Sequence, residues 1–315
     1  MFTICIPVYN YDVGDLVYSL HRQAMQVGLP FEILLMDDAS EEEYREKNSA
    51  IHLPHLQYIQ LPENVGRSRI RNLLGKQAKY PYLIFMDCDS AVSSDDYINR
   101  YIPYFKPDII CSGGRIYEER QPHGKKRLHW KYGVKREVFS AEKRVKKSNF
   151  GFMTCNFLIY KPLLEKNPFN EDLTGYGHED TLFGIQLKEQ SFDIQQIDNP
   201  LIHLGLEDSD VFIGKTENAL INLRKIDKIL WEKYPFSVEH SSLIRIKNIL
   251  EKMHLLPLSA IFFFIFKPLI KMNLCGRYPS LFLFDLYKIG TLAALHATAT
   301  FREYDNKKND NAFIK

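Results

Sequence analysis

The first third of the chain alternates short apolar runs with stretches whose apolar residues recur at helical spacing. The apolar runs cover residues 3–8, 32–36, 56–61 and 82–86. The helical positions between them are Leu16, Val17, Leu20 and Ala24 in one stretch, and Ile70, Leu73, Leu74 and Ala78 in another. This β-α-β rhythm, with strands that are nearly continuous apolar runs, predicts an α/β fold with a mostly parallel central sheet and flanking helices on both faces.

Composition indicates a globular protein of one large domain with an appendage. The chain has 315 residues, of which 45% are hydrophobic and 25% charged, and its net charge of +2 favours no particular partner. The opening residues MFTICIPVYN contain no basic leader, so we interpret them as the first strand rather than a signal peptide. The cysteines lack CxxC spacing and are odd in number, which predicts reduced thiols in a cytoplasmic protein; they are Cys5, Cys88, Cys111, Cys155 and Cys275.

Polar residues follow each apolar run, where the carboxyl ends of parallel strands form the usual ligand-binding edge. Each set alone is compatible with a turn or a helix cap. Their joint placement favours a binding site. The residues concerned are Tyr9 and Asn10, then Asp37, Asp38 and Ser40, then Asn64 and Gly66, and finally Asp87 and Asp89.

The stretch FMDCDS ends an apolar strand in two aspartates separated by Cys88. Two carboxylates so placed repel one another unless a positive group lies beside them, and Mg²⁺ or Mn²⁺ is the usual partner of such hard oxygen ligands. A second Asp-x-Asp, at 208–210, lies in a polar stretch without a preceding strand. We therefore expect the metal at Asp87 and Asp89.

Two other enzyme classes lack their motifs. A dinucleotide oxidoreductase needs GxGxxG between its first strand and helix, where this chain has PVYNYDVGD. A nucleotidyltransferase needs a glycine-rich basic loop at the same place, and none is present.

The segments PVYN, LLMDDAS, NVGRSRIRN, FMDCDS and GYGHED, in this order, resemble the family 2 glycosyltransferases of the Rossmann-like GT-A fold. Residue Ile70 departs from the alanine often found there, which affects only local helix packing. The resemblance covers residues 1–205. It implies a catalytic domain with a nucleotide-sugar-binding half at 1–111 and an acceptor-side half at 112–205, a nucleotide-diphosphate sugar donor, and Mn²⁺ or Mg²⁺ as cofactor.

The resemblance also implies roles for individual residues. Asp89 would be the principal metal ligand, Asp87 a ribose or metal contact, and Asn156 an acceptor contact. His203 is either a further metal ligand or a structural histidine. The residues implied to bind the nucleotide sugar are Pro7, Val8, Tyr9, Asn10, Asp38, Ser40, Asn64, Gly66, Arg71, Asp87 and Cys88, with Asp38 and Tyr9 at the base.

The pair Glu179-Asp180 starts a helix-like stretch after GYGH. Acidic residues suit the positive end of a helix dipole without any catalytic role. By the resemblance, Asp180 is the catalytic base and Glu179 supports it. A base that takes the proton of an acceptor hydroxyl permits direct displacement with inversion, and no covalent intermediate is needed.

The segment 125–147 is rich in basic residues and lacks a strong period. It fits a solvated surface excursion with helical turns, or a mobile flap that attracts an anionic acceptor or a phospholipid surface.

Residues 206–315 turn helical, with Leu220, Leu223, Ile226 and Leu230 near helical spacing. The run 255–266 is the most apolar of the chain and is too short for a typical membrane span. It fits either a core helix or a helix lying in the membrane interface, with Lys267 and Lys271 at the headgroups.

The sequence therefore predicts an inverting enzyme that moves sugar from a UDP-linked donor to a hydroxyl of a glycan or lipid-linked acceptor in cell-surface polysaccharide synthesis. We expect it in the cytoplasm, at the inner face of the membrane, without nucleic acid partners. The alternative is a silent nucleotide-sugar-binding or assembly subunit of the same fold.

Overall fold

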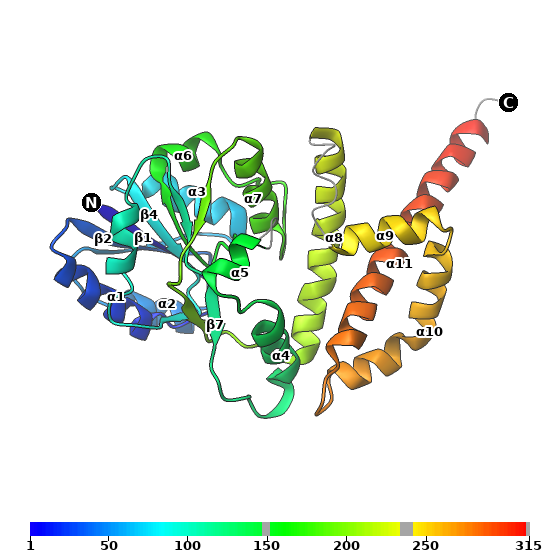
Figure 1. Cartoon of the computed structure of the whole chain (residues 1–315), viewed down its shortest axis with the longest axis horizontal. Coiled ribbons are helices and arrows are strands. Elements are labelled where there is room, and N and C mark those ends of the chain that lie inside the picture. Colours follow the sequence, from blue (N-terminus) through cyan, green and yellow to red (C-terminus); the bar gives the residue numbers. More distant parts are fainter. Residues whose placement is uncertain (147–151, 234–241, 313–315) are drawn as a thin grey trace. The chain divides into compact units, whose positions relative to one another are not determined.

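The computed structural model describes residues 1–146, 152–233 and 242–312 (Figure 1). The chain divides into two compact units. The sheet unit comprises Met1–Gln121 and Tyr132–Leu206, and the helical unit comprises Pro122–Lys131 and Glu207–Lys315. The division near residue 206 is close to the predicted boundary, but residues 122–131, predicted as part of the acceptor-side half, group with the helical unit. They do so because the His129 ring stacks on Phe212 at 4.2 Å between ring centroids.

The four predicted strands form one parallel block of the sheet unit. They are β1 (Phe2–Val8), β2 (Phe31–Asp37), β3 (Leu56–Gln60) and β4 (Tyr82–Met86), and they lie in the order β3-β2-β1-β4. The sheet continues through β8 (Asn156–Tyr160), which is antiparallel to both β4 and β6 (Ile110–Ser112), to β9 (Ile194–Gln196), which is parallel to β6. This confirms an α/β fold with a mostly parallel sheet.

A second, three-stranded sheet positions part of the site. It contains β5 (Ser90–Val92), β10 (Leu201–His203) and β7 (Arg115–Tyr117). In the antiparallel pairing of β10 with β5, His203 lies opposite Ser90. Residues more than a hundred positions apart are thereby brought side by side.

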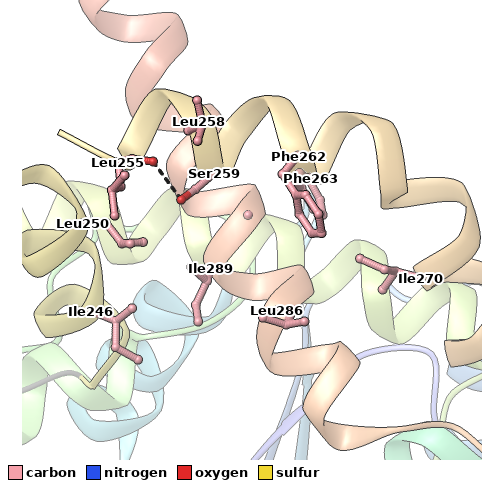
Figure 2. Close-up of a pocket in the computed structure, with 11 residues that line it drawn as sticks. Ile246, Leu250, Leu255, Leu258, Ser259, Phe262, Phe263, Ile270, Leu286 and Ile289 are labelled. Carbon is pink, nitrogen blue, oxygen red and sulfur yellow. Dashed lines mark hydrogen bonds between the residues drawn. The ribbon is translucent and has the colours of Figure 1, made fainter. Parts of the chain in front are cut away.

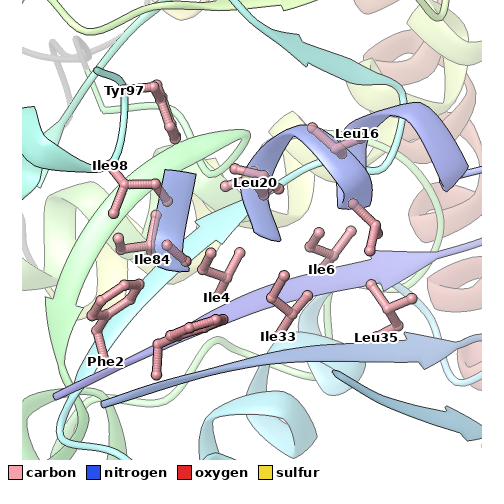
Figure 3. Packing of buried hydrophobic residues seen from close by; sticks show 14 of the residues in the cluster. Phe2, Ile4, Ile6, Leu16, Leu20, Ile33, Leu35, Ile84, Tyr97 and Ile98 are labelled. Atoms are coloured by element: carbon pink, nitrogen blue, oxygen red, sulfur yellow. The ribbon is translucent and has the colours of Figure 1, made fainter. Parts of the chain in front are cut away.

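Helices cover both faces of the large sheet, which is why its central strands are largely apolar. On one face, Ile4 and Ile6 pack with Leu16 and Leu20 of α1 (Gly14–Val27), as Figure 3 shows. On the other face, Leu34 packs in a cluster with residues of α3, α6 and α7. These helices are α3 (Arg67–Gln77), α6 (Lys161–Lys166) and α7 (Glu179–Glu189). The sequence analysis missed α2 (Glu42–Ser49), whose eight residues include a single buried one.

The charged middle segment contains η2 (Gly124–Lys126), α4 (Arg127–Arg136) and α5 (Ala141–Lys146), while η1 (Asn99–Tyr104) precedes β6. The predicted helical turns are therefore present. Residue Lys147, at the end of the predicted basic excursion, lies outside the described residues.

The helical unit contains α8 (Ser209–Lys233), α9 (Ser242–Lys252), α10 (Leu256–Leu274) and α11 (Leu281–Ala312). On α8, the predicted apolar positions Leu220, Leu223 and Ile226 are buried. The side chain of Leu230 lies outside the described residues. Only three residues of α10, namely Phe263, Ile270 and Leu274, are buried, so α10 is not a core helix along most of its surface.

Candidate active site

The loops after β1, β2 and β3 meet at one edge of the sheet. The Asn10 N–H donates to Ser40 Oγ at 2.8 Å, and the Asn64 side chain donates to the Asp38 carbonyl at 3.1 Å. The Asp38 carboxylate accepts the N–H groups of Val65 and Gly66, at 2.6 and 3.1 Å. Gly66 adopts a φ of +83°, in the left-handed region that favours glycine. These polar residues converge at the carboxyl end of the sheet.

Asp38 and Tyr9, the predicted contacts to the nucleotide base, differ in exposure. Asp38 is buried, and burial raises the pKa of its carboxyl against the lowering effect of its two backbone hydrogen bonds. The Tyr9 side chain is 53% exposed, which leaves its ring accessible for stacking. Val8 is buried in β1 and Pro7 is half-buried. Burial raises the pKa of the Cys88 thiol to about 12, so this thiol stays protonated near neutral pH. The nucleotide-binding roles of these residues remain predictions.

Three arginines surround the Asp87 carboxylate. Buried Arg71 donates to Oδ1 at 2.7 Å, and Arg115 donates to Oδ2 at 3.3 Å. An Arg67 guanidinium nitrogen lies 3.7 Å from Oδ2. The positive charge beside Asp87, which the sequence analysis attributed to a metal, is therefore guanidinium. These arginines favour the predicted ribose contact of Asp87 over a metal ligand, and its role remains a prediction.

Asp89 lies against His203, as the β5–β10 pairing requires. His203 Nδ1 is 3.5 Å from Asp89 Oδ1, and the Leu204 N–H donates to the Asp89 carbonyl at 2.8 Å. Burial alone would raise the pKa of Asp89, but the neighbouring His203, with Arg115 and Arg67, holds it below its usual value. Gly205 packs so closely that a Cβ there would lie 2.0 Å from Asp89 Oδ2.

The Asp89–His203 pair suits two ligands of one cation. Asp89 Oδ1 is buried and accepts no hydrogen bond within 3.5 Å from any other described side chain. A carboxylate oxygen beside an imidazole nitrogen is a donor set that Mn²⁺ accepts. Among the described residues, no group of three or more His, Cys, Asp or Glu side chains could hold a metal ion. Within the described part of the chain, Asp89 and His203 are therefore two candidate ligands, and further ligands would come from the donor or from water.

The N-terminus of α7 carries the two predicted catalytic carboxylates. The preceding turn has positive φ at Gly175, Gly177 and His178. Arg67 Nε donates to Glu179 Oε1, and although burial alone would raise the pKa of Glu179, Arg67 and Arg71 lower it. Glu179 is therefore ionised and paired.

Asp180 is held differently from its neighbour. Its Oδ1 accepts the Thr181 N–H at 2.6 Å, and no arginine hydrogen bond to it occurs among the described residues. Burial and the negative charge of Glu179 raise the pKa of Asp180 to about 6. A carboxylate with this pKa is partly protonated near neutral pH, as expected of a general acid or base.

Asp87, Glu179 and Asp180 line one polar cavity of about 120 Å³. Arg67, Arg115, Glu137 and Tyr176 also line it. Arg67 belongs to the motif NVGRSRIRN and was not singled out. Arg115 of β7 lies 3.5 Å from Glu137, which follows α4, in an ion pair. Neither residue carried a sequence signal, because the two elements are brought together only by the tertiary fold.

Asn156 does not lie where an acceptor could reach it. It is fully buried in β8, where its Oδ1 accepts the hydroxyls of Tyr97 and Tyr101 at 2.6 Å. Its Nδ2 donates to the carbonyls of Gly114 and Asn199 at 2.8 Å. All of its hydrogen-bonding capacity is used inside the protein, which favours a structural role over the predicted acceptor contact.

Replacing Asn156 with alanine is expected to lower the free energy of unfolding by about 3 kcal/mol or more, because each buried polar partner left unpaired costs about 1–3 kcal/mol. Denaturant unfolding measures this. The exposed Asn99→Ala serves as the control and should stay within about 0.5 kcal/mol of the parent. An Asn156→Ala variant of unchanged stability but impaired activity would contradict the structural role.

A solved structure of a mannosyltransferase shares this fold. Among solved structures, the mannosyltransferase PcManGT from Pyrobaculum calidifontis, in complex with GDP-Man and Mn²⁺, superimposes with a TM-score of 0.53 at 13% identity, over 93% of this chain and 85% of that chain. TarS 1-349 from S. aureus with UDP gives 0.42 at 20% identity, over 73% and 70%. GalNAc-T7 with UDP, GalNAc and Mn²⁺ gives 0.49 at 15% identity, over 80% and 54%.

No curated protein sequence matches the chain. The fold is nevertheless that of the GT-A glycosyltransferases, as predicted. The family model described as "Glycosyl transferase family 2" matches residues 3–167, just over half of the chain. The protein therefore belongs to glycosyl transferase family 2.

Proposed function

We propose that this protein is an inverting, metal-dependent glycosyltransferase that moves a sugar from a nucleotide-diphosphate donor, expected to be UDP-linked, to a hydroxyl of a glycan or lipid-linked acceptor. The observation that carries the proposal is Asp180, with a pKa of about 6, beside a cavity that arginines also line. Family membership supports the reaction class.

The donor would lie along the edge where the loops after β1, β2 and β3 meet. The exposed Tyr9 ring offers a surface for the base, and Arg67 and Arg115 offer positive charge for the diphosphate. A structure of the same fold contains GDP-Man and Mn²⁺, which supports a nucleotide sugar as donor and leaves the nucleotide to be tested.

Asp180 would accept the proton of the acceptor hydroxyl while the oxygen attacks the anomeric carbon. The bond from that carbon to the diphosphate oxygen breaks, and the nucleoside diphosphate leaves from the opposite face, which inverts the anomeric configuration. Glu179 stays ionised through Arg67 and keeps the pKa of Asp180 raised. A cation held by Asp89 and His203 would supply Lewis-acid stabilisation of the departing diphosphate.

We further propose a role in cell-surface polysaccharide synthesis at the cytoplasmic face of the membrane. The support is the exposed apolar surface of α10, which suits an enzyme whose acceptor is lipid-linked.

A panel of nucleotides and nucleotide sugars tests the proposal. We expect calorimetry to detect binding of one of UDP, GDP or dTDP, strengthened by Mn²⁺, and the corresponding nucleotide sugar to be hydrolysed or transferred. If none of the nucleotides binds, the alternative of a silent assembly subunit holds. If nucleotide sugar binds but is not turned over with any hydroxyl acceptor tried, a silent binding subunit is the better description.

A further inference from the structure

The outer surface of α10 is apolar and exposed in the helical unit. Among the described residues, this is the one helix long and apolar enough to cross a membrane, yet only 17% of its apolar window is buried. Seven large apolar side chains on it are between 55% and 82% exposed, namely Leu258, Ile261, Phe262, Phe264, Ile265, Leu269 and Met272. A contiguous patch of this kind on a protein marks an interaction surface.

A pocket opens beneath this surface, between α9, α10 and α11. Figure 2 shows Ile246 and Leu250 from α9, Leu258 and Phe262 from α10, and Leu286 and Ile289 from α11 around it. Its volume is about 420 Å³, within the range of small-molecule sites. Among its lining residues only Ser259 has a polar side chain, and its hydroxyl donates to the Leu255 carbonyl of the same helix at 2.9 Å. The pocket therefore offers a ligand no polar side chain to bind.

The segment that carries the apolar surface has only basic charged residues. From Leu256 to Phe284 the chain has no acidic residue, while Lys267, Lys271 and Arg277 are basic. Lys267 faces inward, where it pairs with Glu217 at 2.9 Å. Arg277 is exposed at the turn between α10 and α11 and lies over the exposed ring of Tyr278. The ring of Phe282, at the start of α11, is also exposed.

A second basic segment is hydrogen-bonded to this turn. Arg127 donates to the Arg277 carbonyl at 3.0 Å, and Lys131 donates to the Pro279 carbonyl at 2.8 Å. These bonds hold η2, with exposed Lys125 and Lys126, near the same end of α10. Basic and aromatic residues at one end of an apolar helix are typical of the headgroup region of a membrane.

We infer that the helical unit binds the surface of an anionic lipid bilayer, with the outer face of α10 among the acyl chains and the pocket between α9, α10 and α11 holding one hydrocarbon chain. The helix lies on the membrane rather than across it, because its inner face packs on α11 and its Lys267 pairs within the protein. A second copy is the less favourable occupant, since facing basic ends would repel one another.

Vesicle co-sedimentation of the full chain tests the surface. We expect binding to phosphatidylcholine vesicles to strengthen when phosphatidylglycerol is included and to weaken with salt. The double variant Phe264→Ser, Ile265→Ser should lose roughly tenfold or more in affinity. Lys125→Gln with Lys126→Gln should lose on the order of fivefold per residue on anionic vesicles only. Met25→Ser, which changes an exposed methionine of α1 in the sheet unit, is the matched control and should bind normally.

A fluorescent fatty-acid analogue tests the pocket. Ser259→Phe would fill the pocket from within and should abolish binding of the analogue, while Met25→Ser retains it. Circular dichroism checks that each variant is folded.

Two results would overturn the proposed membrane binding. One is unchanged vesicle binding by the Phe264→Ser, Ile265→Ser variant. The other is a wild-type protein that does not bind vesicles and is a dimer by light scattering, while this variant is a monomer. That result would assign the surface to a second copy of the chain. If the Ser259→Phe variant still binds the fatty-acid analogue, the proposal that the pocket holds a hydrocarbon chain is wrong. None of these outcomes bears on sugar transfer, which is measured separately with a soluble acceptor.

Discussion

Asp180→Asn is expected to lower kcat for sugar transfer by on the order of 10²–10⁴-fold while leaving the affinity for the donor nearly unchanged. Asparagine keeps the size of the side chain and can still accept the Thr181 N–H, but it cannot take the proton of an acceptor hydroxyl. Steady-state kinetics with the identified donor and acceptor measures kcat, and calorimetry measures donor binding. Asp172→Asn, an exposed aspartate in the loop before α7, is the matched control and should keep wild-type kinetics.

The pH profile separates a base from a merely structural aspartate. Asp180 works as a carboxylate, so protonation inactivates it, and kcat/KM should fall about tenfold per pH unit below its pKa of about 6. Burial comes first among the causes of this raised pKa, and the charge of Glu179 second. Glu179→Gln removes that negative charge, which lowers the pKa of Asp180 and moves the acid limb of the profile to lower pH. Transfer by Asp180→Asn at close to the wild-type rate would disprove the base assignment.

The parallel part of the sheet was predictable because its evidence is local. The strands β1, β2 and β4 are largely apolar, since both faces of the sheet are covered by helices. The edge strand β3 combines Leu56, Tyr58 and Ile59 with two exposed glutamines. The turns after these strands follow directly in the chain, so their meeting at one edge was predictable as well. By contrast, α2 buries one residue among eight and has almost no apolar period to detect.

The features of the site that the sequence could not show are contacts between residues distant in the chain. Arg71 and Arg115 reach Asp87 from 16 and 28 residues away, and no local pattern shows that guanidinium already neutralises this carboxylate. Asn156 begins an apolar strand and looked like a polar residue at a site, but its partners Tyr97 and Tyr101 lie on another element. A single sequence gives residue types and periods, whereas ion pairs and buried hydrogen bonds depend on the tertiary fold.

Asp89→Asn is expected to remove the strengthening of nucleotide-diphosphate binding by Mn²⁺, leaving the affinity measured without metal. The affinity for the metal should fall at least about 10–100-fold, which is the loss typical of mutating residues that only hydrogen-bond to metal ligands. The reason is geometric, because Asp89 Oδ1 is buried beside His203 and receives no other hydrogen bond among the described side chains. Calorimetry of the nucleotide diphosphate with and without Mn²⁺ measures the difference. Asp210→Asn, which changes the exposed aspartate of the second Asp-x-Asp, is the control that should bind normally.

Gly205→Ala gives an independent test of the same site without changing a ligand. Its Cβ would lie 2.0 Å from Asp89 Oδ2, so the carboxylate or the loop must move. We expect a partial loss of Mn²⁺-dependent binding, smaller than that of Asp89→Asn, with metal-free binding preserved. Electron paramagnetic resonance of bound Mn²⁺ reports directly on ion occupancy in each variant. If Asp89→Asn holds Mn²⁺ as well as the parent does, the cation lies elsewhere, and Asp89 and His203 form only a structural pair.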